Sequence, residues 1–160
     1  MSGEPVTEAT GGPEGRNTLR KRLLRGIAVQ TAVVAGAVHL LWAWPRLGSP
    51  PDARPYLFLA GSALAVAVGV ATLRAGEYRR LYALGAGTLG TFLGGFLAWH
   101  GTGAAAALSA EPLAIVAAVV ELVGIAAFLA LFRLAPPTSV VVERRNRGEN
   151  EAGTEGEAES

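Results

Sequence analysis

The chain has 160 residues, of which 51% are apolar and 17% charged, and its formal net charge is +1. It contains no cysteine, which excludes disulfides, thiolate metal sites and cysteine nucleophiles. The charged residues crowd the two ends and a few short loops, leaving four apolar blocks almost without charge. A helix of a soluble protein needs a polar face, so this distribution argues against a soluble domain. It predicts an all-α, polytopic membrane protein: an antiparallel bundle of four transmembrane helices with disordered termini.

Residues 1–18 are rich in Gly, Pro, Glu and Thr and predict a disordered tail, because they offer too little apolar surface to offset chain entropy. The first span, residues 26–44, would reach ~28 Å, enough to cross a bilayer core of ~30 Å. Trp42 and Trp44 at its end indicate an interfacial anchor rather than the cleavage site of a signal peptide. A basic cluster precedes this span: Arg20, Lys21, Arg22 and Arg25.

The transmembrane domain is predicted to cover residues 19–134. Three further apolar blocks give its other spans: residues 56–73, 81–99 and 112–132. The connections between the spans, including residues 100–111, are predicted to be short loops, so that consecutive spans run antiparallel. Residues 135–160 are rich in glutamate towards their end and predict a disordered acidic tail.

Small residues recur along the second and third spans. Gly61 and Gly69 lie on one face of the second span, and Gly90 and Gly94 form a GxxxG pair in the third. Glycine disfavours a helix in water, but in a membrane it lets two helices approach closely. We therefore predict that these four glycines lie at helix–helix contacts.

The basic residues predict the orientation of the spans. The segment before the first span, the second loop and the segment after the fourth span hold 5, 3 and 4 basic residues, whereas the other two loops together hold two, Arg46 and Arg54. By the positive-inside rule, both termini are cytoplasmic in a cell membrane. The basic cluster is then expected to set topology and to contact lipid headgroups. Nucleic-acid binding is not expected, because the cluster abuts a span.

Ionisable side chains inside a span are costly and usually face the bundle interior, so His39 is a candidate site residue. At about 100° per residue, His39 shares a helix face with small residues. These are Ala28, Ala32, Ala35, Gly36 and Ala43. The simplest interpretation is a neutral histidine that hydrogen-bonds across helices. Proton handling, metal binding or haem ligation is the alternative.

Glu121 is the only acid inside a predicted span, and it should also point inward. It shares its face with Ala114, Ala117, Ala118 and Gly124. Glu121 would lie ~13 Å deep and His39 ~5 to 6 Å nearer the outer surface, a difference that the glutamate side chain partly spans. We predict a His39–Glu121 pair. The alternative is a protonated Glu121 bonded to a backbone carbonyl or to one of three hydroxyls, those of Ser62, Thr88 and Thr91.

His100 follows Trp99 at the outer interface, and the simplest interpretation gives it no site function. A haem held by His39 and His100 is a weaker alternative, since imidazoles are common axial ligands. The chain has no GxSxG, P-loop, HExxH or paired-acid motif. We therefore predict a protein that is not an enzyme and has no cofactor.

Three stretches resemble a known group of proteins. GAVHLLWAWPRL in the first span, YRRLYALGAG at the start of the third and PLAIVAAVVELVGIAAFLALFR in the fourth resemble small four-helix integral membrane proteins of haloarchaea. A weaker likeness, in span number and size alone, is to the DoxX-like four-helix membrane proteins. The resemblance implies archaeal origin, membrane localisation and architecture, but no activity.

The leading functional hypothesis is a non-enzymatic membrane component or accessory subunit. It rests on the missing enzyme motifs and on the abundant small-residue packing surface. Its expected partners are the lipid bilayer and either further copies of the chain or other membrane subunits. Two alternatives remain: permeation of protons or small solutes through His39 and Glu121, and a haem or redox protein.

Overall fold

The computed structural model describes residues 13–48, 52–74 and 78–135, with backbone alone for 13–17. Every regular element in these ranges is helical, as the sequence predicts. The predicted tails, apart from residues 13–18 and 135, lie outside the described residues. The elements in chain order are α1 (Pro13–Ala43), η1 (Trp44–Arg46), α2 (Arg54–Arg74), α3 (Arg79–His100), η2 (Gly101–Gly103), α4 (Ala104–Ala110) and α5 (Pro112–Leu134).

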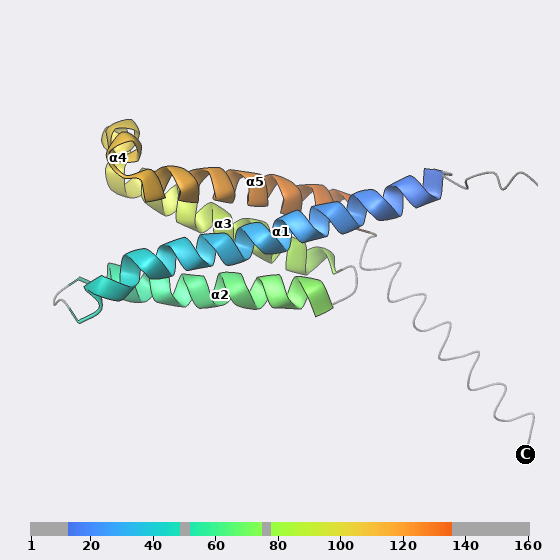
Figure 1. The fold of residues 1–160 in the computed structure, drawn as a ribbon, viewed down its shortest axis with the longest axis horizontal. Coiled ribbons are helices and arrows are strands. Elements are labelled where there is room, and N and C mark those ends of the chain that lie inside the picture. Colours follow the sequence, from blue (N-terminus) through green and yellow to red (C-terminus); the bar gives the residue numbers. More distant parts are fainter. Residues whose placement is uncertain (1–12, 49–51, 75–77, 136–160) are drawn as a thin grey trace, which may run out of the picture.

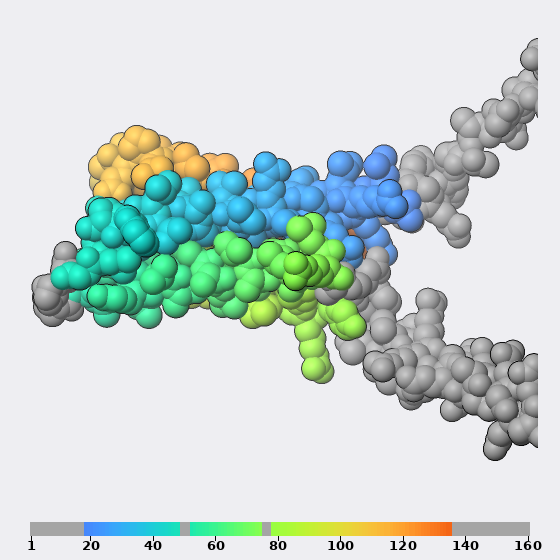
Figure 2. Space-filling view, turned by 60° about the horizontal axis from the view of Figure 1, so that its bottom comes forward, coloured from blue at the N-terminus to red at the C-terminus, as the bar shows by residue number. Residues whose placement is uncertain are grey.

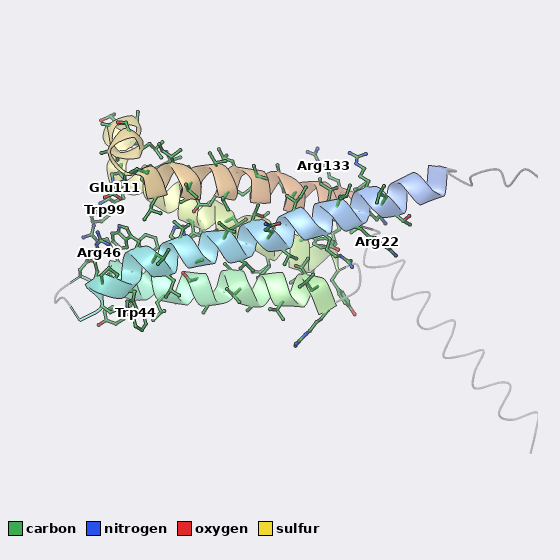
Figure 3. The ribbon with its side chains drawn as sticks, viewed as in Figure 1. Arg22, Trp44, Arg46, Trp99, Glu111 and Arg133 are labelled. Carbon is green, nitrogen blue, oxygen red and sulfur yellow. The ribbon has the colours of Figure 1, made fainter. Side chains whose placement is uncertain are left out.

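The chain folds into an all-α bundle whose four long helices are each long and apolar enough to cross a membrane. The helix α1 packs against both α2 and α5, and α3 packs mainly against α5 (Figure 1). Arg22 and Arg133 lie at one end of the bundle, and Trp44 and Trp99 lie at the other (Figure 3). We call these the basic end and the tryptophan end.

The two described stretches that depart from the prediction lie at helix ends. Residues 13–18, predicted to be disordered, form the first turns of α1, and residues 100–111, predicted to be a loop, contain η2 and α4. Pro13 suits the first helical turn, and an alanine-rich run such as α4 has high helix propensity. Both features favour a helix through local backbone preference and not through apolar character, so a prediction based on hydropathy does not find these turns. The helix α4 lies crosswise to the spans (Figure 1).

The glycines of α2 pack as predicted, whereas those of α3 do not. The helices α1 and α2 lie side by side (Figure 2), and a Cβ atom on Gly69 would lie 3.7 Å from Val33 of α1. A Cβ on Gly61 would lie 2.5 Å from the ring of Phe92 in α3. Gly90 and Gly94 have nothing within 4 Å, so the prediction that they pack against another helix of this chain is wrong.

The core is densest in the half of the bundle near the basic end. Tyr82 and Leu89 of α3 and Phe128 and Leu131 of α5 are all buried there. Gly85 lies directly against the ring of Phe128, and a Cβ at this position would come within 2.6 Å of it. Because that ring is fully buried, it has no free space into which to move.

This close contact predicts that Gly85→Ala destabilises the protein. The added methyl group overpacks the core, at a cost of about 1–3 kcal/mol. The matched control is Gly90→Ala on the same helix, which meets open space and should be neutral or stabilising by less than about 1 kcal/mol. Thermal unfolding of both variants in detergent measures the difference, and equal melting temperatures would contradict this account of the core.

Candidate functional site

The site begins with the orientation of His39 on α1. Ala28, Ala32 and Ala35, which share its face on the preceding turns of α1, are all buried. The imidazole stacks on the ring of Phe92 in α3, with centroids 3.9 Å apart and an interplanar angle of 16°. Phe58 of α2 lies on another side, with its ring centroid 5.0 Å away. His39 therefore occupies a pocket formed by three helices.

The ring nitrogens of His39 have different partners. Nδ1 lies 2.9 Å from the backbone oxygen of Ala35. A carbonyl oxygen only accepts hydrogen bonds, so Nδ1 carries a hydrogen and donates it. The other nitrogen, Nε2, faces α5 and lies 3.5 Å from Oε1 of Glu121. The structure thus brings together the two residues that the sequence singles out.

Glu121 is 2% exposed, and its Oε1 makes no hydrogen bond to any described residue. Because Nδ1 of His39 is already protonated, a carboxylate facing a bare Nε2 would set two lone pairs against each other. One proton therefore belongs between Nε2 and Oε1. Whether it resides on the acid or on the imidazole, the pair has no net charge. We expect it on Glu121, since that arrangement leaves no separated charges in the apolar interior.

The hydroxyl groups proposed as alternative partners of Glu121 donate elsewhere. The hydroxyls of Ser62 and Thr88 donate to carbonyls one turn back on their own helices, at 2.6 Å and 2.9 Å. Thr91 does the same at 2.9 Å. Each hydroxyl keeps lone pairs that can still accept a hydrogen bond. None of the three donates to the carboxyl group.

A cavity of about 860 Å³ connects this pair with the tryptophan end. Glu121 and His39 both line it, and on α5 it is bounded by Ala114, Ala117 and Ala118, the residues predicted to share the Glu121 face. Its lining is mainly apolar, with polar groups near its rim. These rim residues are Arg54, His100 and Glu111. In α3 and α5, the buried residues lie almost entirely on the basic side of the pair, although the cavity lining also continues along α3 to Leu84 and Ala83.

A polar contact at the rim joins α2 to α3. Arg54 binds Asp52 through both carboxylate oxygens, with Nη2–Oδ2 at 2.6 Å and Nε–Oδ1 at 2.8 Å. These hydrogen bonds lower the pKa of Asp52. The guanidinium carbon of Arg54 lies 4.5 Å from the ring centre of Trp99, a cation–π contact. In the sequence, Arg54 counts only toward the charge of the first loop, and nothing in its spacing to Trp99 indicates this contact.

The two histidines of the haem hypothesis both line the cavity, and each has a bond within its own helix. Nδ1 of His100 is bonded to the oxygen of Phe96 at 3.0 Å, and its ring lies against that phenyl ring. Nδ1 of His39 is bonded to Ala35, and its Nε2 faces Glu121. Among the described residues, no group of three or more His, Cys, Asp or Glu side chains is placed to hold a metal ion.

Comparisons of the chain with models of protein families, with curated proteins and with solved structures found no match. The resemblance to haloarchaeal four-helix membrane proteins therefore stays a prediction.

The shared proton predicts how the bundle responds when Glu121 is changed. In Glu121→Gln the amide still donates to Nε2 of a neutral His39, so we expect a loss of less than about 1 kcal/mol. Glu121→Ala leaves a cavity and an unpaired imidazole nitrogen, and should cost about 2–5 kcal/mol. Thermal unfolding of the two variants beside wild type tests this. A Gln variant as damaged as the Ala variant would show instead that the pair is a buried ion pair.

Proposed function

We propose that this chain is a non-enzymatic, multi-pass protein of the cell membrane that binds a small amphiphile. The observation that carries the proposal is the cavity of about 860 Å³ that begins at the tryptophan end and reaches the buried His39–Glu121 pair. A mainly apolar cavity with a few convergent polar groups is typical of small-molecule sites. The ligand would be an apolar molecule with a single polar group at one end.

The deep end of the cavity favours a ligand that donates a hydrogen bond. The single proton of the His39–Glu121 pair is used between Nε2 and Oε1, so the remaining lone pairs of the carboxyl group can only accept a hydrogen bond. The hydroxyls of Thr88 and Thr91 use their hydrogens on backbone carbonyls and can only accept from a ligand. An alcohol or phenol group supplies the donor that this set of acceptors lacks.

The packing below the pair favours uptake from one end over passage through the bundle. Leu89, Phe128 and Leu131 are buried on the basic side of Glu121 and fill the space between α3 and α5. A permeating proton or solute would need these side chains to separate. No such rearrangement is needed for a molecule that enters and leaves at the tryptophan end.

A brominated alcohol tests this proposal, because bromine quenches tryptophan fluorescence and Trp42 and Trp99 line the cavity. With 11-bromoundecanol, the hydroxyl would reach the pair while the bromine stays near the mouth. We expect saturable quenching in the purified wild-type protein in detergent. Glu121→Leu, which replaces the polar end with an apolar group of similar size, should weaken binding at least tenfold.

The control ligand is 1-bromoundecane, which has the same chain without the hydroxyl. We expect it to quench weakly and without saturation. If both bromides quench alike in wild type and in Glu121→Leu, the quenching reports partition into detergent and the proposed site is wrong.

The proposal includes an orientation in which both termini are cytoplasmic and the cavity mouth faces outward. The excess of basic residues at the basic end supports it. Because the chain has no cysteine, single cysteines can report it directly. In intact cells, a membrane-impermeant maleimide should label Ala53→Cys and Thr102→Cys, but should label Ser2→Cys and Ser160→Cys only after lysis. The reverse pattern would overturn the orientation.

A further inference from the structure

A second, smaller cavity of about 210 Å³ lies at the basic end of the bundle, far along α1 from the His39 site. Its polar wall comes from α1 and α3: Lys21, Arg22, Arg25 and Tyr82. Its apolar wall comes from the end of α5, where Leu131 and Leu134 line it. Three cations thus surround a hollow that is apolar on its other side.

The guanidinium of Arg25 is held in place rather than free in solvent. Its Nη2 donates to the hydroxyl of Tyr82 at 3.1 Å, and Tyr82 is 2% exposed. That bond uses one of the five N–H groups of the arginine, and the planar fork that remains matches the oxygens of a phosphate. The contact also joins α1 to α3, so the position of Arg25 depends on the packed core.

The charged side chains that line this cavity in the described part of the chain are all cationic. The acidic residues whose side chains the structure describes are Asp52, Glu111 and Glu121, and none of them lines it. Arg22 and Arg25 are three residues apart on α1, a spacing at which like charges repel. An anion bound in the cavity would offset that repulsion.

We propose that this cavity binds the phosphate of an anionic phospholipid headgroup. The cations lie just beyond the apolar part of the first span, at the depth where headgroup phosphates meet a bilayer. Leu131 and Leu134 would contact the first carbons of the acyl chains below the phosphate. A free phosphate ion shares the charge chemistry but would leave this apolar wall without a partner.

The experiment titrates detergent-solubilised full-length protein with dioleoylphosphatidylglycerol and follows bound lipid by native mass spectrometry. We expect Arg22→Gln and Arg25→Gln each to weaken binding about fivefold, which corresponds to about 1 kcal/mol for one cation near a headgroup. Arg80→Gln is the matched control, since Arg80 is exposed and does not line the cavity. It should bind as wild type does.

Further arms separate a built site from general attraction. Tyr82→Phe keeps the buried ring but releases Arg25, and it should weaken binding without unfolding the core. Dioleoylphosphatidylcholine should bind more weakly than the anionic lipid, and millimolar inorganic phosphate should not displace the lipid. Equal losses in Arg80→Gln and Arg25→Gln would overturn the site, and displacement by free phosphate would overturn the lipid as its ligand.

Discussion

Two ionisable side chains cannot stay apart and unpaired inside an apolar bundle, and the arrangement of α1 against α5 follows from this constraint. Joining His39 to Glu121 requires the two helices to run close together. A small residue permits that approach: Gly124 on α5 is buried, and a Cβ atom there would come within 2.7 Å of Thr31 on α1. Gly124 lies one turn from Glu121, so this close contact between α1 and α5 lies near the pair. The polar contact and the small-residue contacts therefore stabilise each other.

The large cavity lies where α5 presents small side chains, at the end of the bundle that also holds the longer connection. The helices α2 and α3 are joined through residues 75–78, whereas residues 101–111 separate α3 from α5 and include α4, which lies crosswise to the spans (Figure 1). The space between α3 and α5 lacks large buried side chains, since Ala114, Ala117 and Ala118 face it from α5. Glu121 is buried and also lines the cavity, whose lining continues along α3 to Leu84 and Ala83.

Much of this arrangement could be predicted from the sequence, because helix geometry fixes which residues share a face. A rotation of about 100° per residue places His39 among alanines and Glu121 beside Gly124 without knowledge of the fold. The side chains that surround the pair could not be predicted in this way. Phe92 is one apolar residue among many in its span, and only the docking of α3 places it on the imidazole. Gly90 and Gly94 meet no other helix of this chain, since a GxxxG pattern marks a surface that permits close approach but does not specify the neighbour.

The hydrogen bond between Nδ1 of His39 and the oxygen of Ala35 explains how the pair acquires a defined geometry. The bond spans one helical turn, so α1 forms it without help from other helices. His100 makes the same bond to Phe96 at the exposed end of α3, which shows that the contact needs no enclosed site. The tautomer of His39 is therefore set by its own helix, and Nε2 is already the nitrogen that faces outward from α1 when α5 docks. Glu121 then meets an imidazole whose unprotonated nitrogen is Nε2. The tautomer of His39 is set by α1 alone, and it requires a proton between Nε2 and Oε1 once α5 has docked.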